Sequence, residues 1–269
     1  QEMPSLTAAI SADPILGKTK IIAEPWDCVG LYQLGGFPGG ERNRWSEWNG
    51  RFRDDIRRFQ RGDENVATAA ATRIAGSSDC YNHDGRSPLA SINFITSHDG
   101  FTMNDLVSYN YKHNEENGEE NRDGSDDNLS YNHGFEGECT NPKIEGMRLK
   151  TIKNFFVSLM TAQGVPMLLG GDEMRRTQHG NNNAYCQDND ISWYDWSLAQ
   201  KNAGLVRFVS KLIQLRKDHD VFRRASFFSE DAGRGDGALP EISWYDPFGK
   251  VPDWKKTGRF LAYKLGGLE

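Results

Sequence analysis

Short apolar segments alternate with amphipathic helical segments along most of this 269-residue chain. Residues 20–23, 91–96 and 165–169 are apolar runs too short for a core helix, and Gly, Pro or charged residues bound them, as is typical of buried strands. Residues 152–160 and 205–213 instead place apolar side chains at helical spacing on one face. This order of strand, helix, strand and helix predicts parallel βα units, and therefore an α/β fold.

The sequence changes character after Phe222. Residues 241–245 and 259–263 are typical of antiparallel strands separated by loops that contain Gly and Pro. We therefore predict two units: residues 1–222 form the α/β unit, and residues 223–269 form the beginning of a β-sandwich domain.

Composition and charge narrow the classes of partner. The formal net charge of −6 gives no electrostatic case for binding nucleic acid or an anionic membrane, and no apolar run approaches the ~18 residues of a membrane span. The cysteines, Cys28, Cys80, Cys139 and Cys186, include no C-x-x-C pair, which favours free, buried or half-buried thiols. The sequence contains neither a phosphate-binding loop nor a zinc motif, so we expect no metal and no cofactor.

A carboxylate directly follows the first predicted strand. Glu24 comes after residues 21–23 and precedes Pro25 and Trp26. Burial at the tip of a strand, beside a Trp ring, is expected to raise its pKa, as protonation of a glycosidic oxygen near neutral pH requires. The alternative is a structural role, in which Glu24 caps a loop or pairs with an arginine.

Polar residues also follow the other two predicted strands. His98 and Asp99 could form a metal site, a base with its orienting carboxylate, a sugar clamp or a hydrogen-bonded turn before Gly100. Spacing alone does not choose among these. Asp172 and Glu173 follow two glycines after the third strand, and we favour a structural role for their carboxylates.

The chain also has two long polar loops. Residues 112–137 and 178–189 are rich in Asn, Glu, Asp, Gln or Gly and have no apolar periodicity, and loops of this length are usually functional or mobile. Amide groups match the hydroxyls of a sugar, and aromatic rings nearby in the sequence can stack on its C–H faces. The mixture suits an uncharged polyol ligand, although each aromatic taken singly is more typical of partly buried packing.

Three strings resemble strand motifs of the α-amylase superfamily: residues 22–27 resemble the fifth strand, residues 94–100 the seventh and residues 164–173 the eighth. Longer strings are similar to isoamylases and bacterial glycogen debranching enzymes, namely residues 45–54, 113–124 and 179–189. The resemblance implies an α/β fold that forms the second half, strands five to eight, of a (β/α)8 TIM barrel.

The resemblance also implies a function, the hydrolysis of α-1,6 branch linkages in glycogen or amylopectin with retention of configuration. Glu24 would be the general acid/base, Asp99 would stabilise the transition state and His98 would bind the sugar. The partner would be a branched α-glucan. The candidate substrate-binding residues are Trp26, His98, Asn183, Tyr185, Gln187 and Asn189.

The second carboxylate that such hydrolysis needs is not evident in these residues. Spacing alone pairs Glu24 with Asp99, but the resemblance assigns the nucleophile to an Asp inside a Gly-Phe-Arg-Phe-Asp-like motif, which does not occur here. Residues 1–19 resemble the helix that precedes the fifth strand. We therefore expect these 269 residues to be part of a longer enzyme and to be inactive alone.

Two rival functions stay open at this point: a non-catalytic isoamylase-like subunit that binds glucan, and an amylase relative that cleaves α-1,4 linkages. The sequence leaves open whether the protein forms an oligomer. It also does not separate a plastid location, expected for a plant or alga, from the cytoplasm of a bacterium.

Overall fold

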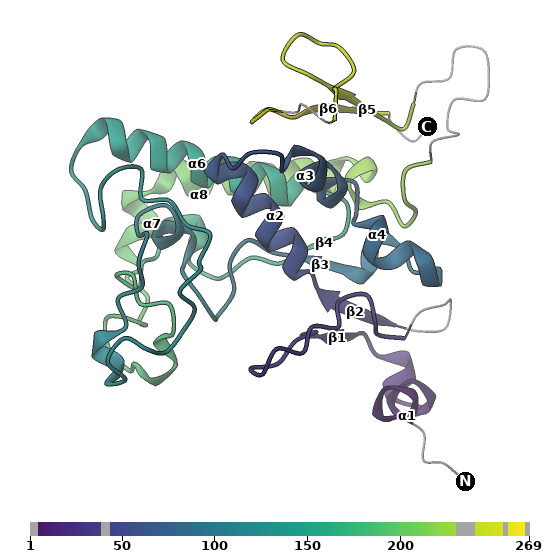
Figure 1. Cartoon of the computed structure of the whole chain (residues 1–269), viewed down its shortest axis with the longest axis horizontal. Coiled ribbons are helices and arrows are strands. Elements are labelled where there is room, and N and C mark those ends of the chain that lie inside the picture. Colours follow the sequence, from purple (N-terminus) through teal and green to yellow (C-terminus); the bar gives the residue numbers. More distant parts are fainter. Residues whose placement is uncertain (1–4, 39–43, 230–239, 255–257, 267–269) are drawn as a thin grey trace.

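The computed structural model describes residues 5–38, 44–229, 240–254 and 258–266 (Figure 1). Its strands are β1 (Ile21–Ala23), β2 (Trp45–Trp48), β3 (Ser91–Asn93), β4 (Val165–Pro166), β5 (Ile242–Tyr245) and β6 (Ala262–Leu265). Its α-helices are α1 (Leu6–Ala12), α2 (Gly50–Arg61), α3 (Ala67–Ile74), α4 (Ser78–Tyr81), α5 (Met103–Leu106), α6 (Pro142–Thr161), α7 (Ser197–Lys201) and α8 (Ala203–Asp218). Short 3-10 turns lie at Leu16–Lys18, Asn82–Asp84, Pro88–Ala90, Glu115–Asn117, Asp172–Met174, Ala184–Cys186 and Asp220–Arg223.

A parallel sheet in the order β1-β2-β3-β4 organises the fold, which confirms the predicted α/β class. The three predicted strands are present, but β3 and β4 end earlier than the apolar runs suggest. β3 ends at Asn93, and Thr96 lies beyond the sheet, where its hydroxyl donates a hydrogen bond to the Asp172 carboxylate. The ladder of β4 is short partly because Pro166 has no N–H to donate.

Sequence analysis did not identify β2 as a strand. Polar residues interrupt the apolar pattern of this strand. One of them, Glu47, lies in the middle of the strand and is completely buried. The Arg86 guanidinium pairs with that carboxylate, and the backbone N–H of Gly35 donates to it at 2.6 Å. A buried charge is tolerated only with such partners, and they come from residues far away in the sequence.

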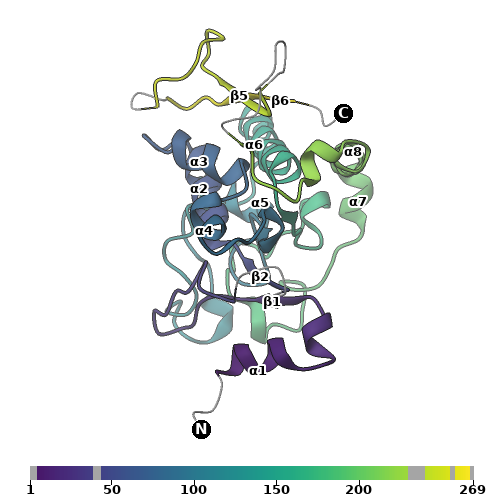
Figure 2. The same cartoon turned by 90° about the vertical axis from the view of Figure 1, so that its right-hand side faces the viewer.

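The core lies among four helices and the segment that follows β3. The predicted helices at 152–160 and 205–213 are confirmed as parts of α6 and α8, and α2 and α3 complete the group (Figures 1 and 2). Asn49 begins α2 by accepting a hydrogen bond from the backbone N–H of Phe52 at 2.9 Å. Gly62 ends it in the left-handed conformation, with φ of 89°.

The two polar loops pack against one another. The side-chain amide of Asn114 donates to Asn182 Oδ1 at 2.9 Å, and that of Asn183 donates to Asp123 Oδ2 at 2.8 Å. Asn182 is 2% exposed, so this contact is interior. Figure 1 shows the loops side by side at one end of the molecule.

An antiparallel hairpin of β5 and β6 follows the α/β part. The strand predicted at 241–245 is confirmed, whereas β6 lies three residues beyond the predicted start at Arg259. The Tyr263 ring packs 5.2 Å from Trp244, and its hydroxyl contacts Thr161 at the end of α6. The predicted unit 223–269 includes residues 230–239, 255–257 and 267–269, and the helix resemblance at 1–19 includes residues 1–4; all of these lie outside the described residues.

All the cysteines are free thiols, but only Cys80 and Cys139 fit the predicted burial. Cys28 and Cys186 are exposed, because Cys28 lies in the turn after β1 and Cys186 lies in the second polar loop. None of the helices in the described ranges combines the length and the apolar character needed to cross a membrane.

Candidate functional site

The carboxyl ends of the parallel strands bring together residues that are far apart in the sequence. Glu24 and Trp26 follow β1, Trp48 ends β2, and His98 and Asp99 follow β3. Ligand sites of α/β sheets are commonly built at this edge.

An aromatic cluster, which we define as Trp26, Trp48, Phe94 and His98, lies at this edge. The Trp48 ring is 6.4 Å from Trp26, 5.6 Å from Phe94 and 5.8 Å from His98, with an edge-on arrangement toward the histidine. Trp48 therefore links the segment after β1 to the segment after β3. The stacked ring of Tyr32, 6.1 Å from Trp26, extends the cluster.

Helix α2 supports the same cluster. The Arg53 guanidinium lies 5.8 Å from the Trp26 ring centre and 5.7 Å from that of Phe94, within the range of a cation–π contact. Gly50 leaves room for the rings, because a Cβ there would lie 2.8 Å from the Tyr32 hydroxyl and 3.3 Å from the Trp26 ring.

Glu24 is exposed, so the expected burial of its carboxylate is wrong. The physical reason is that, among the described residues, β1 is an edge strand with only β2 as a neighbour. Glu24 has no hydrogen bond or ion pair with any described residue, whereas Asp27 nearby accepts two backbone N–H groups. The structural alternative, in which Glu24 caps a loop or pairs with an arginine, therefore has no partner within the described ranges.

His98 and Asp99 form a pair that faces solvent. His98 Nε2 lies 3.6 Å from Asp99 Oδ2, and the two side chains are 64% and 69% exposed. The backbone N–H of Gly100 donates to the Asn182 carbonyl at 2.9 Å, so the second polar loop lies directly beside this pair.

Asp172 clamps both ends of the segment that carries the pair. One carboxylate oxygen accepts from the Thr96 hydroxyl, and the other accepts from the backbone N–H of Met103 at 2.9 Å. Burial raises the pKa of Asp172 to about 7. The Arg57 guanidinium adds a third hold on this segment by donating to the Ile95 carbonyl at 2.9 and 2.6 Å. These contacts support a structural role for Asp172, in which it holds the His98–Asp99 turn in place.

A second buried carboxylate fixes the loop after β4. Asp105 accepts from the Thr177 hydroxyl at 2.5 Å and from the backbone N–H of Gln178 at 2.7 Å. Its burial raises the pKa of this carboxyl. Sequence analysis gave no signal for Asp105, because Thr177 and Gln178 lie more than seventy positions away.

The predicted substrate-binding amides already have protein partners. Gln187 donates to Asn117 Oδ1 at 2.8 Å, and Asn189 donates to Gln187 Oε1 at 2.8 Å. The bonds from Gln187 to Asn117 and from Asn183 to Asp123 hold the two polar loops together, and the bond from Asn189 lies within the second loop. A direct contact of these amides with a sugar stays a prediction.

Exposed aromatic rings lie on this loop and on the segment that follows it. Tyr185 is 72% exposed and donates its hydroxyl proton to Glu119 Oε1 at 3.0 Å, a bond that raises the pKa of the phenol. Trp193 is 60% exposed and Trp196 72% exposed. Flat apolar faces presented to solvent in this way can stack on sugar rings.

The site offers acid–base and stacking groups. An exposed carboxylate, a histidine–carboxylate pair and aromatic faces can protonate, polarise and stack on a neutral ligand. Within the described ranges, no group of three or more His, Cys, Asp or Glu side chains could hold a metal ion. The contributions of Phe94 and Arg53 were not predicted, although Phe94 directly precedes the His98 segment in the sequence.

Comparison with known proteins shows similarity along nearly the whole chain. It is 49% identical over 251 residues to a glycogen operon protein GlgX homolog of Mycobacterium bovis, a match that covers 93% of this chain and 34% of the relative. It is 46% identical to a glycogen debranching enzyme of Cronobacter sakazakii and 44% identical to the chloroplastic isoamylase 3 of Oryza sativa subsp. japonica, covering 98% of this chain in each case and 39% and 32% of the relatives. The chain thus spans about a third of the length of these relatives. No protein-family model matches it.

Solved structures of pullulanases share the fold. The pullulanase of Anoxybacillus sp. LM18-11 complexed with maltotetraose has a TM-score of 0.56 at 25% identity, over 89% of this chain and 30% of that protein. The pullulanase from Bacillus acidopullulyticus has a TM-score of 0.56 at 23% identity, over 76% of this chain and 23% of that protein. The resemblance found in the motifs is therefore confirmed, and the chain is a relative of the isoamylases and glycogen debranching enzymes along nearly its whole length.

Proposed function

We propose that this chain carries one part of the active site of a retaining glycoside hydrolase that cleaves α-1,6 branch linkages in glycogen or amylopectin. The observation that carries the proposal is the exposed Glu24 carboxylate, which has no partner among the described residues and lies two positions before Trp26 of the aromatic cluster that includes His98. The names of the relatives and the maltotetraose bound to a pullulanase support an α-glucan substrate.

Each polar residue has a proposed role in the reaction. Glu24 protonates the leaving glycosidic oxygen and then deprotonates the attacking water. Asp99 stabilises the positive charge that develops on the sugar, and His98 binds the sugar at the point of cleavage. Trp26 and the loop at 181–189 shape the groove for the branched chain, with Asn183, Tyr185, Gln187 and Asn189 as candidate contacts.

Glu24 needs no burial before substrate arrives. A bound sugar that stacks on the aromatic cluster would itself exclude water from the carboxylate.

We further propose that β1 to β4 are strands five to eight of a (β/α)8 barrel, and that 1–222 and 223–269 belong to successive domains. Parallel order, helical crossovers and the fold shared with pullulanases support the barrel. The unpaired edge of β1 and the exposed side chains around it, Leu6 at 76%, Ile15 at 74% and Ile22 at 52%, support a further segment that covers this side.

The experiment compares substrates and variants in the complete natural polypeptide that carries these residues. We expect release of linear chains from amylopectin and cleavage of pullulan, without cleavage of maltohexaose. Glu24→Gln should lower turnover at least a thousandfold while glucan binding is largely kept, and Glu64→Gln, an exposed glutamate on another loop, serves as the matched control.

The outcomes separate the rival functions. Unchanged turnover in Glu24→Gln would remove Glu24 from its role. Cleavage of maltohexaose would favour an α-1,4-acting amylase relative. Glucan binding without any hydrolysis would favour a non-catalytic subunit.

A further inference from the structure

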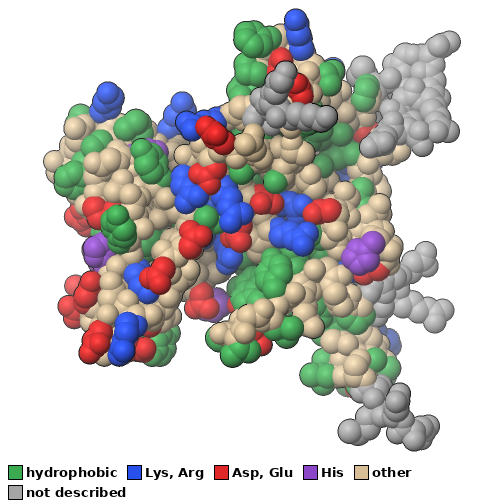
Figure 3. Space-filling model, in the orientation of Figure 1, with side chains coloured by type: hydrophobic (Ala, Val, Ile, Leu, Met, Phe, Trp, Pro, Cys, Tyr) green, Lys and Arg blue, Asp and Glu red, His purple; other side chains and the backbone are tan. Residues whose placement is uncertain are grey.

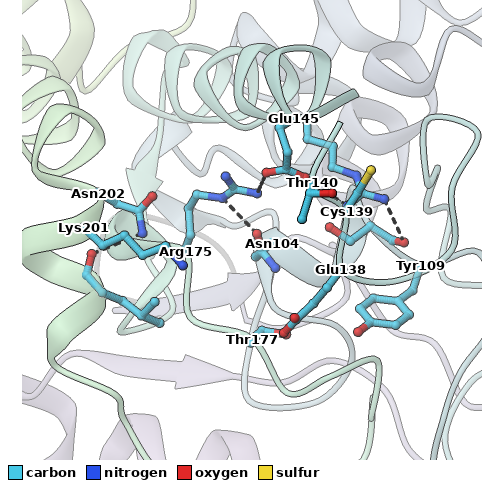
Figure 4. Close-up of a pocket in the computed structure, with 13 residues that line it drawn as sticks. Asn104, Tyr109, Glu138, Cys139, Thr140, Glu145, Arg175, Thr177, Lys201 and Asn202 are labelled. Carbon is cyan, nitrogen blue, oxygen red and sulfur yellow. Dashed lines mark hydrogen bonds and ion pairs between the residues drawn. The ribbon is translucent and has the colours of Figure 1, made fainter. Parts of the chain in front are cut away.

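A cavity of about 520 Å³ lies at the start of α6, between the segment after β3 and helix α7 (Figure 4). Its volume falls within the ~300–1,000 Å³ that small-molecule sites typically have. It shares no lining residue with the aromatic cluster or with Glu24 and Asp99. The proposed reaction therefore makes no use of this cavity.

The two arginines in its wall share one carboxylate. The Glu145 carboxylate accepts a hydrogen bond from Arg148 Nη1 at 3.1 Å and forms an ion pair with Arg175 Nη2 at 2.9 Å. The Arg148 guanidinium also donates to backbone carbonyls, among them that of Gly137 at 2.8 Å. An anion would have to compete with Glu145 for both guanidinium groups.

The wall also presents many uncharged donors and acceptors. Thr140 is exposed at the cavity, and its hydroxyl has no hydrogen bond with a described residue. Asn104 accepts from Arg175 Nε at 2.9 Å, and its amide nitrogen donates to Asp105 Oδ1 at 3.5 Å, a long bond that a sugar hydroxyl could replace. Lys201 and Asn202 line the opposite side. This spread of hydroxyl, amide and ammonium groups matches a ligand with many hydroxyls.

Two further features mark the cavity as more than a packing gap. Arg148 Nε is buried and has no hydrogen-bond partner within the described ranges, which is rare for a polar atom. Arg175 has a φ of 63°, a left-handed conformation that costs a non-glycine residue about 1 kcal/mol. Backbone strain of this kind clusters at functional sites, and here it directs a guanidinium into the cavity.

We propose that this cavity is a second binding site for a short stretch of neutral α-glucan. The hydroxyls of the sugar would bind Thr140, Asn104 and Lys201, and a C–H face would contact the Tyr109 ring in the wall. The choice of α-glucan among hydroxyl-rich ligands rests on the proposed function. A branched substrate would then be held at two points, one chain at the cleavage site and another at the cavity.

The test measures maltotriose binding by isothermal titration calorimetry, using the complete natural polypeptide with Glu24→Gln so that no hydrolysis occurs. We expect two binding events. Thr140→Trp, which fills the cavity, and Lys201→Met should each weaken one event at least tenfold. Lys211→Met, an exposed lysine of α8 that does not line the cavity, should change neither event.

A cross-check separates the two sites. His98→Ala should weaken only the event that the cavity variants leave intact. Two unchanged binding events in Thr140→Trp would overturn the proposal, as would inorganic phosphate displacing maltotriose from the cavity. A polypeptide that hydrolyses no glucan, but loses one maltotriose site in Thr140→Trp, would refute the proposed function and leave the cavity site standing.

Discussion

At the scale of single residues, Trp48 connects the two halves of the candidate site. It contacts both Trp26 and His98, whereas Trp45, three positions earlier on the same strand, is only 8% exposed and packs 5.3 Å from Phe37. The two rings lie on opposite faces of β2, because side chains alternate along a strand. Their roles should therefore separate into ligand contact and stability.

We predict that Trp48→Leu lowers kcat/KM for amylopectin at least tenfold and changes the unfolding free energy by less than Trp45→Leu does. Trp45→Leu should destabilise the protein by about 2–3 kcal/mol, since it leaves a cavity in packed surroundings, and should leave kcat/KM nearly unchanged. Steady-state kinetics and urea denaturation of both variants check this. Equal losses of activity would show that Trp48 does not act at the site.

Asp172 is the residue whose titration should affect stability. Its pKa in the folded protein is raised to about 7 from an ordinary value of 3.8, because the charged form is buried. A raised pKa means that this group stabilises the fold fully below about pH 4, and that the contribution is lost as the pH rises through 7.

We predict that wild type loses stability relative to Asp172→Asn between pH 4 and pH 7, because the asparagine cannot titrate. Each unit of pKa shift corresponds to about 1.4 kcal/mol. Urea denaturation of both proteins at pH 4.5, 6 and 8 measures the difference. Parallel curves for the two proteins would contradict the prediction.

At the scale of elements, α8 completes the end of α6. The Arg216 guanidinium donates to the carbonyls of Met160 and Ala162 at 2.8 Å each and to that of Gly164 at 2.5 Å. These carbonyls belong to the last turn of α6 and the residues after it, which have no partner further along a helix. Burial, and repulsion from Arg223, lower the pKa of Arg216 to about 10, so the capping bonds have to offset a cost of burying the charge.

We predict that Arg216→Met lowers the unfolding free energy by about 3 kcal/mol, since three buried carbonyls lose their donors. Arg207→Met, an exposed arginine of the same helix, is the control and should change it by less than about 0.5 kcal/mol. Thermal and urea denaturation measure both. A loss no larger than that of the control would mean that water replaces the guanidinium at this helix end.

At the scale of the whole molecule, the described chain has one open side. β1 pairs only with β2, and Val29 at 90% exposure and Leu31 at 51% continue the apolar surface beside it. Figure 3, in contrast, shows basic and acidic side chains interspersed over α2, where Arg73 pairs with Asp55 at 3.3 Å and with Asp79 at 2.5 Å. The charged surface over α2 thus suits contact with solvent. The apolar side beside β1 suits contact with more protein.

We predict that residues 1–269 expressed alone release no linear chains from amylopectin, because retaining hydrolysis needs two carboxylates and Asp99 is proposed to stabilise charge and not to attack. The isolated chain should also aggregate through its open edge strand. Reducing-end assays and size-exclusion chromatography measure both effects, with the complete natural polypeptide as the control. Robust release of chains that Glu24→Gln abolishes would contradict this prediction.

The sequence by itself determined the elements whose signals are local. The apolar runs predicted β1, β3 and β4, and the helical spacing predicted α6 and α8, because side-chain periodicity depends only on neighbours along the chain. It also singled out Glu24, His98 and Asp99, since each directly follows such a run.

Only the tertiary structure decided what depends on distant partners. The sequence did not reveal β2, because only folding brings Arg86 to the charge of Glu47. Glu24 is exposed because β1 has a single neighbour in the described sheet. The amides of the loop at 178–189 were expected to bind a ligand. In the structure they form hydrogen bonds with the opposite loop, as Asn183 does with Asp123. Burial and pairing are set by which segments meet in space, so a pattern of single residues cannot specify them.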